Sequence, residues 1–152
     1  MKHKKYRLTC RKAKLVDAKI YYEWVRDATV KKNALSKNKI TWNSHKAWFK
    51  KKLNNKNSNL YLFNYNNSLV GQVRFDRNKN SVKIDYSLKK SFRGLGLGKK
   101  IIKLAMKNYN IKKNLTFVGN VKKSNIPSIK VFNSLGFRKI IKNKIYTFKK
   151  EI

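Results

Sequence analysis

The sequence predicts an α/β (α+β) fold in which a mixed central sheet of about seven strands is flanked by about four helices. Apolar residues alternate in some segments and recur at helical spacing in others, and the two kinds of segment succeed one another along the chain. No repeat, linker or change in composition divides the 152 residues, and the chain contains only 1 Pro. We therefore expect a single domain over residues 1–152, long enough to bury one core.

The first half of the chain begins with an alternating strand over residues 5–10 and a helix over 15–25. Residues 28–43 are polar and irregular, with room for one short helical turn. Ser44 is expected to cap a second helix, which ends near Leu53.

A three-strand meander follows an Asn-rich loop, and helices and strands then alternate. Asn66-Asn67 is a good pair for the first tight turn of the meander. Pro127 lies near the start of the last helix, where its missing N–H costs nothing, and Gly136 ends that helix. The expected strands cover 60–65, 69–76, 82–88, 115–120, 138–141 and 145–148, and the expected helices cover 96–109 and 125–135.

The chain is strongly basic, because 40 Lys and Arg against 6 Asp and Glu give a formal charge of +34. Such a charge usually indicates nucleic acid or another phosphate-bearing partner. Here 33 cations are Lys, 7 are Arg and 19 residues are Asn, and positions 1–76 hold 19 basic and 4 acidic residues against 21 and 2 in positions 77–152. We interpret this even charge mainly as a product of AT-rich codon usage. We expect no specific nucleic-acid partner, although the charge would attract a small polyanionic ligand.

No apolar run approaches the roughly 20 residues that a membrane span needs, and the first residues lack the apolar segment of a signal peptide. The one cysteine, Cys10, excludes an intramolecular disulfide and a cysteine-based zinc cluster. We therefore expect a cytoplasmic protein without a membrane span or a bound metal.

The most informative segment covers residues 86–99, where a strand is expected to end and a helix to begin. Gly94, Gly96 and Gly98 remove Cβ atoms where the chain turns and a ligand can approach the backbone. Free amides at the helix start favour negative charge, so the segment can hold a diphosphate, although a tight turn alone would also explain the glycines. A Walker A loop is excluded because no Ser or Thr follows Lys99. A dinucleotide-binding turn is excluded because the motif follows four strands and no acidic residue succeeds it within about 20 positions.

Two motifs resemble the GNAT acyltransferase superfamily. Arg93-x-x-Gly96-x-Gly98 matches its acetyl-coenzyme A signature, between the fourth strand and the following helix. The segment from Asn125 to Phe137 matches a second signature, Asn-x-x-Ser/Ala-x-x-x-Tyr/Phe-x-x-x-Gly-Phe, and the order of elements agrees over nearly the whole chain. The resemblance implies the GNAT fold and an acetyl-CoA-dependent N-acetyltransferase.

The resemblance also implies where acetyl-CoA binds. The strand end would pair with the pantetheine arm, and a backbone N–H near Leu88 would polarise the thioester carbonyl. The glycine turn would hold the pyrophosphate through its amides, and the next helix would contribute polar side chains. The implied cofactor-binding residues are Tyr86, Ser87, Leu88, Arg93, Gly94, Leu95, Gly96, Leu97, Gly98, Lys99, Asn125 and Ser128.

In such enzymes an unprotonated amine attacks the thioester directly, so a base and sometimes an acid are needed. The usual thiolate-protonating tyrosine is replaced by Phe132, so either another group serves as the acid or the thiolate leaves unaided. Tyr86 and Tyr146 are the candidate substitutes, with an ordinary core or surface position as the alternative explanation for each. The acidic residue that is frequent on the fourth strand is displaced to Asp85, our preferred base. His45, at the start of the second helix, is the other candidate. The remaining acidic residues are Asp17, Glu23, Asp27, Asp76 and Glu151.

The N-terminal half would build the acceptor site. Its segments 22–27 and 44–49 resemble amino-sugar nucleotide N-acetyltransferases of pseudaminic and related nonulosonic acid pathways, and Gln72-Val73-Arg74-Phe75 supports that likeness. Trp24-x-Arg26-Asp27 also occurs in acetyltransferases that modify ribosomal-protein N-termini. The implied substrate-binding residues are Trp24, Arg26, His45, Trp48 and Arg74, with Trp42 as a further ring that could stack on a sugar or base. Ordinary core packing is the alternative explanation for Trp24 and Trp48.

Three functions remain open. The first is N-acetylation of a small acceptor, foremost a UDP-4-amino-sugar; the second is the same chemistry on a protein or peptide amine; the third is a non-enzymatic basic module that binds nucleic acid. The scarcity of acidic residues disfavours a basic peptide substrate, and the two signatures disfavour the third function. The oligomeric state is open, and a homodimer is among the states considered.

Overall fold

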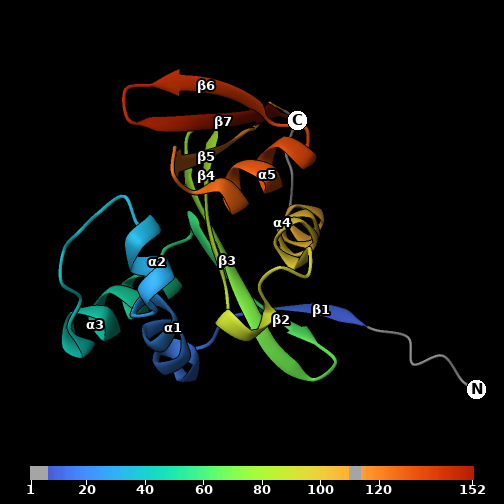
Figure 1. Cartoon of the computed structure of the whole chain (residues 1–152). Coiled ribbons are helices and arrows are strands. Elements are labelled where there is room, and N and C mark those ends of the chain that lie inside the picture. The colour runs from blue at the N-terminus through green and yellow to red at the C-terminus, as the bar shows by residue number, and fades with distance from the viewer. Residues whose placement is uncertain (1–6, 110–113) are drawn as a thin grey trace, which may run out of the picture.

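The computed structural model describes residues 7–109 and 114–152. Their strands form a seven-stranded sheet in the order β1-β2-β3-β4-β5-β7-β6 (Figure 1). β4 and β5 run parallel and all other neighbours run antiparallel, so the sheet is mixed, as predicted. β1 and β6 form the two edges of the sheet.

The elements lie close to the predicted ranges, and the predicted fold class is confirmed. The strands are β1 (Leu8–Lys12), β2 (Ser58–Tyr65), β3 (Ser68–Asn78), β4 (Ser81–Leu88), β5 (Thr116–Lys122), β6 (Arg138–Lys142) and β7 (Ile145–Glu151). The α-helices are α1 (Ala18–Val25), α2 (Ala28–Asn33), α3 (Trp42–Leu53), α4 (Leu97–Asn108) and α5 (Ile126–Ser134), with short 3-10 helices η1 (Leu15–Asp17) and η2 (Lys90–Phe92). The first residues of the strand predicted over 5–10 lie outside the described part.

Helix caps account for the two differences from the predicted helices. We expected at most one helical turn in segment 28–43, but α2 forms there because the side chain of Asp27 accepts hydrogen bonds from two amides of its first turn. The prediction that Ser44 caps α3 was wrong. Thr41 is the cap and accepts a hydrogen bond from the Ser44 amide at 3.2 Å, while the Ser44 hydroxyl accepts one from the Thr41 amide at 3.1 Å.

The predicted turn residues have the backbone angles that their chemistry favours. Asn66 and Asn67 have φ values of 51° and 69°, the left-handed pair that a tight turn between twisted strands requires. Gly136, which follows the C-cap residue Leu135 of α5, has a φ of 78°. These turns fix the β2–β3 hairpin and the return from α5 to β6.

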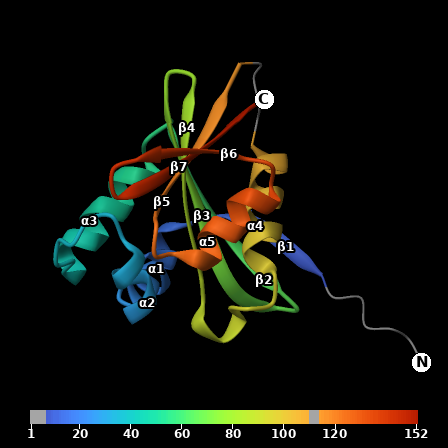
Figure 2. The same cartoon turned by 45° about the horizontal axis from the view of Figure 1, so that its top comes forward.

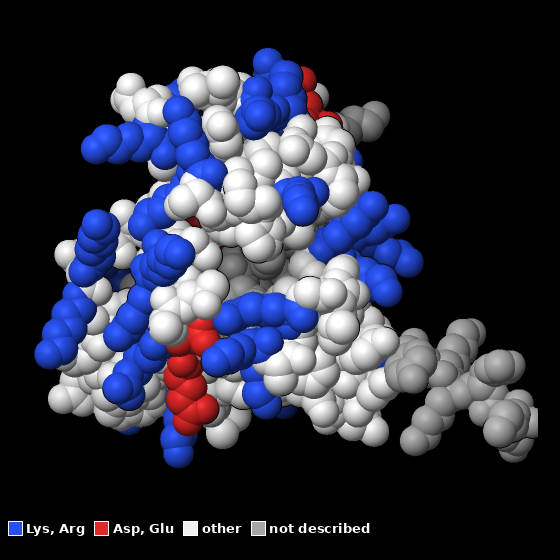
Figure 3. All heavy atoms as spheres, viewed as in Figure 1, with Lys and Arg blue, Asp and Glu red and all other residues white. Residues whose placement is uncertain are grey.

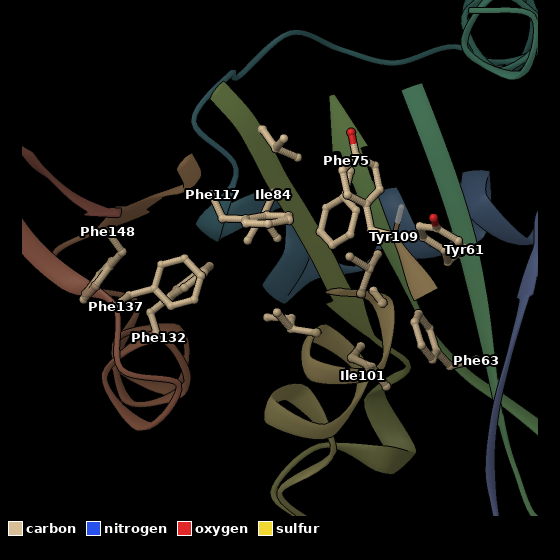
Figure 4. Close-up of a cluster of buried hydrophobic side chains, with 14 of the residues drawn as sticks. Tyr61, Phe63, Phe75, Ile84, Ile101, Tyr109, Phe117, Phe132, Phe137 and Phe148 are labelled. Atoms are coloured by element: carbon tan, nitrogen blue, oxygen red, sulfur yellow. The ribbon is translucent and has the colours of Figure 1, made fainter. Parts of the chain in front are cut away.

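The sheet separates two hydrophobic clusters. Helices α1 to α3 lie together on one side of the central strands and α4 lies on the other (Figure 1 and Figure 2). The larger cluster packs on α4 and α5 and is rich in aromatic rings (Figure 4), among them Tyr61, Phe63, Phe75, Tyr109, Phe117, Phe132, Phe137 and Phe148. The smaller cluster lies under α1 and α3 and consists of Ala18, Tyr21, Trp24, Phe49, Leu60 and Leu62.

β4 and β5 separate after a short contact. Residues 81–83 of β4 pair with residues 116–118 of β5, whereas β4 stays paired with β3 as far as Leu88. Among residues 7–109 and 114–152, none pairs with the β5-facing edge of β4 from Ile84 to Leu88. The sheet is therefore open between these strands, and the glycine turn after β4 and helix α5 after β5 lie at this opening.

Candidate active site

Backbone groups of β4 point into the opening. The amide of Lys89 donates to the carbonyl of Val70 at 2.8 Å, so at this position the backbone faces β3. Because backbone groups alternate in direction along a strand, Leu88 and Tyr86 direct their N–H and C=O groups toward the opening. An extended chain lying there would find the Tyr86 N–H and C=O groups and the Leu88 N–H group without a strand partner in the described part of the chain, as the resemblance implied for the pantetheine arm. The Leu88 carbonyl oxygen accepts a hydrogen bond from Arg93 Nε at 3.1 Å.

The glycine turn leaves the start of α4 uncapped. Gly94 and Gly96 have φ values of 77° and 73°, which glycine adopts without strain, and a Cβ atom on either would meet nothing within 4 Å. Gly96 is the N-cap of α4 and has no side chain to accept hydrogen bonds from the free amides of the first turn. These amides and the helix dipole fit a pyrophosphate.

The other residues of the turn have different roles. A Cβ atom on Gly98 would lie 3.2 Å from Val131, so Gly98 allows α4 to pack closely on α5. The Leu97 side chain is buried in the core, which leaves its amide for a ligand. Leu95 and Lys99 are exposed beside the turn.

The N-terminus of α5 brings together three of the predicted cofactor residues. Asn125 Oδ1 accepts a hydrogen bond from the Ser128 amide at 3.4 Å and caps the helix. The hydroxyl groups of Ser128 and Tyr86 are 2.7 Å apart, and burial raises the pKa of Tyr86 to about 12. The Tyr86 phenol thus joins the end of β4 to α5 beside the opening.

Phe132 is a core residue rather than a tyrosine that has lost its hydroxyl group. It is 2% exposed, and its ring stacks on Phe148 at a centroid distance of 5.3 Å. A Cβ atom on Gly119 of β5 would lie 2.7 and 2.9 Å from the two Cε atoms of Phe132 and closest of all to its Cζ atom. A hydroxyl group on Cζ in this rotamer would point at β5, so this position offers no proton donor.

The opposite face of β3 and β4 carries a polar cluster around Asp85. Gln72 Nε2 donates to Asp85 Oδ2 at 3.0 Å and to Ser87 Oγ at 3.2 Å, and Arg74 Nη1 lies 3.7 Å from Asp85 Oδ2. The Asp85 side chain is 52% exposed, and within the described chain its Oδ1 accepts no hydrogen bond. Gln72 was predicted only as part of the segment Gln72-Val73-Arg74-Phe75; the signal in the sequence was a polar residue between Gly71 and Val73 of an expected strand.

Three of the other five carboxylates are held in ion pairs, and the remaining two are exposed. Asp17 accepts two hydrogen bonds from Arg11 at 2.8 and 2.9 Å. Asp76 is held by Lys52 at 2.8 Å, by Ser58 and by Arg74, and Asp27 by Arg93. Glu23 and Glu151 are exposed and lie on α1 and at the end of β7.

The structure packs His45 away from solvent. The ring is 2% exposed, and its Nε2 lies 2.9 Å from the Ala18 carbonyl oxygen, to which it donates. Burial lowers the pKa of His45 despite that hydrogen bond. The rings of Tyr22, Trp42, Trp48 and Phe49 surround it, so His45 supports the contact between α1 and α3.

The predicted acceptor residues fall into three places. Trp24 is 8% exposed within the smaller hydrophobic cluster, where it has no free face for a sugar ring. Trp48 is half-buried, and the Arg74 guanidinium lies 5.0 Å from its ring centroid, beside Asp85.

Arg26, a further predicted acceptor residue, lies over the Tyr22 ring at 5.2 Å. With Trp42, 37% exposed, Arg26 lines a depression of about 390 Å³ between α1 and α3, whose other lining residues are Lys19, Tyr22 and Glu23.

Lys and Arg side chains lie below and around a hollow near the middle of one face of the molecule, while uncharged residues form much of its edge (Figure 3). In the same orientation as Figure 1, the hollow lies between α5 and the turn that follows β4. Several cations near a recess at these two elements favour a polyanionic ligand.

The sequence family agrees with this geometry. The model of the acetyltransferase (GNAT) domain matches residues 7–138. The chain belongs to the GNAT acetyltransferase family. It is therefore an acetyl-CoA-dependent N-acetyltransferase, as the resemblance implied, and a non-enzymatic nucleic-acid module no longer explains it.

Solved structures share the fold of this GNAT acetyltransferase. A domain from Methanocaldococcus jannaschii is 20% identical with a TM-score of 0.84, and the match covers 97% of this chain and 99% of that one. The Salmonella typhimurium acetyltransferase that modifies the N-terminal serine of ribosomal protein L7/L12 is 16% identical with a TM-score of 0.79, covering 95% of each chain. Spermidine N-acetyltransferase from Vibrio cholerae is 13% identical with a TM-score of 0.80, covering 93% of this chain and 92% of that one. No curated protein sequence matches the chain.

The described part of the acetyltransferase contains no group of three or more His, Cys, Asp or Glu residues that could hold a metal ion. Among its described helices, none is long and apolar enough to cross a membrane.

Proposed function

We propose that this acetyltransferase transfers an acetyl group to the amine of a small, phosphate-bearing acceptor, foremost a UDP-4-amino-sugar. The observation that carries the proposal is the position of Asp85, a half-exposed carboxylate with a free oxygen on β4, the strand whose open edge leads to the glycine turn. We further propose that residues 1–152 act as one domain in the cytoplasm, where acetyl-CoA is available.

The proposed reaction uses few groups of the chain. Asp85 Oδ1 accepts the proton that the acceptor amine loses as its lone pair forms the C–N bond. The Leu88 amide donates to the carbonyl oxygen as negative charge develops there. The C–S bond then breaks and coenzyme A leaves as a thiolate, and its proposed proton donor is the hydroxyl pair of Tyr86 and Ser128, which are 2.7 Å apart.

Charge and aromatic surface support an anionic acceptor with a ring. Arg26, Lys19 and the exposed Trp42 line one depression, so a planar base can stack while cations meet phosphate. A net charge of +34 would repel a polyamine and attract a nucleotide.

Acetylation of a protein amine is the second candidate. It is favoured by the fold shared with the Salmonella typhimurium enzyme that modifies an N-terminal serine, at 16% identity. Only 6 acidic residues are available to bind a basic peptide, which weighs against such a substrate.

Thiol release measured against a panel of amino-sugar nucleotides and peptides tests the proposal. We expect turnover with an amino-sugar nucleotide, whereas turnover with peptides alone would establish the second candidate. Acetyl-CoA should also raise the melting temperature of the parent protein. Gly96→Glu should abolish that increase by placing a carboxylate in the turn, and Gly96→Asn, which tolerates the left-handed backbone, is the matched control.

A further inference from the structure

Helix α2 is attached at its N-terminus to the turn that follows β4. Asp27 Oδ1, which caps α2 through the amides of Thr29 and Val30, also accepts a hydrogen bond from Arg93 Nη2 at 2.8 Å. Arg93 Nε in turn donates to the Leu88 carbonyl oxygen at 3.1 Å. One carboxylate and one guanidinium therefore connect α2 to the end of β4.

The other end of α2 is attached to β5. Lys122, the last residue of β5, donates from Nζ to the Lys32 carbonyl oxygen at 2.8 Å. The six residues of α2 span about 9 Å at 1.5 Å per residue. Since β4 and β5 have separated at these positions, α2 bridges the opening between them on the side of the sheet where Asp85 lies.

The contacts of Arg93 indicate whether its side chain binds acetyl-CoA or holds α2. Nε and Nη2 both bind groups of the chain, and the side chain is 28% exposed. Burial acts to raise the pKa of Asp27, but the hydrogen bonds from Arg93 and from the Val30 amide outweigh it, so the pKa is lowered and the ion pair persists at neutral pH. The turn can therefore bind phosphate through its amides while the Arg93 side chain holds α2.

We propose that Asp27 and Arg93 are positioning residues for the acceptor: they hold α2 across the opening between β4 and β5, and α2 limits the path by which the acceptor amine reaches the thioester. Lys122 holds the other end of this bridge. The inference rests on the proposed function in one respect, namely that the acceptor approaches from the side of α1 to α3.

Asp27→Asn separates the ion pair from the helix cap, because Asn caps helices about as well as Asp. We expect the KM for the acceptor to rise about tenfold, the change that follows from losing one charged hydrogen bond. The KM for acetyl-CoA should change less than about twofold. Asp17→Asn is the matched control, since it breaks a 2.8 Å ion pair with Arg11, at the start of α1, and should leave both KM values unchanged.

Hydrogen exchange over residues 28–33 provides a readout that needs no turnover. Asp27→Asn should speed exchange there and Asp17→Asn should not. An increase in the KM for acetyl-CoA alone would show that the pair serves the cofactor turn, and unchanged exchange together with an unchanged acceptor KM would show that the pair positions nothing. Either result overturns the inference. A parent enzyme that acetylates peptides only would refute the proposed acceptor and leave this test intact, with the peptide as the varied substrate.

Discussion

The close contact between Gly119 and Phe132 predicts that replacing Gly119 by alanine lowers the stability of the protein, where the same change in an open strand would raise it. In a strand with ordinary backbone angles, Gly→Ala stabilises a protein by about 0.4–1 kcal/mol because it restricts the unfolded chain. Here the new Cβ atom would meet three ring atoms of Phe132, two of them at 2.7 and 2.9 Å, within a core that leaves the ring 2% exposed. Overpacking of this kind costs about 1–3 kcal/mol, so Gly119→Ala should destabilise the protein by about 0.5–2 kcal/mol.

For a chain of this length, that cost should lower the melting temperature by roughly 2–8 °C. Thermal and urea unfolding measure the change, and Phe132→Leu supplies the matched background because leucine lacks the ring atoms that clash. Gly119→Ala should cost about 1 kcal/mol less in the Phe132→Leu background, a coupling typical of residues in contact. A melting temperature at or above that of the parent, or equal costs in both backgrounds, would refute the packing argument.

Three further predictions concern titratable groups. Asp85→Asn should lower kcat/KM by about 10²–10⁴-fold and flatten the acid limb of the pH–rate profile; an unchanged profile would exclude Asp85 as the base. Burial lowers the pKa of His45, so between pH ~6.5 and that lowered pKa the unfolded state takes up the proton and the folded state does not, and stability falls by at most about 1.4 kcal/mol per pH unit. His45→Phe should make that fall shallower in urea unfolding at pH 7 and pH 5.5, and an equal slope would contradict the burial argument. The hydrogen bonds from Arg11 hold the pKa of Asp17 below its usual range, so the stability that they supply is lost as pH falls through that lowered value. Asp17→Asn should therefore reduce the free energy of unfolding by about 1–2 kcal/mol at pH 7 and by less at pH 3. An equal cost at both pH values would contradict a stabilising role of the ion pair.

Local chemistry explains which parts of the fold the sequence could predict. Alternation, helical spacing, Asn66-Asn67 and Gly136 each act within a few residues, so strands, helices and turns could be placed from them. Helix α2 could not, because it is six residues long and depends on the Asp27 cap and on contacts with distant residues. Asp27 and Arg93 are 66 residues apart in the chain, so no local pattern in the sequence pairs them.

The same difference between local and long-range contacts explains which parts of the candidate site could be predicted. The glycine turn could be identified because its function resides in a contiguous backbone segment with a recognisable motif. The burial and the hydrogen-bond partners of each side chain could not be predicted, since they depend on residues from other elements. His45 is enclosed by rings from α1 and α3, and Asp85 is oriented by Gln72 from the neighbouring strand.

The edges of the sheet give the excess of lysine a role unrelated to ligands. β6 is an edge strand that carries the exposed Ile141, whose side chain is 66% exposed, between neighbours that include Lys139 and Lys142. An unpaired strand edge with an exposed apolar residue is a template for association with another chain, and charged side chains on it oppose that association. Since such repulsion is screened within about 8 Å at physiological ionic strength, the lysines protect the edge only while salt is low to moderate. High salt should therefore promote edge-to-edge assembly of this acetyltransferase, beginning at β6.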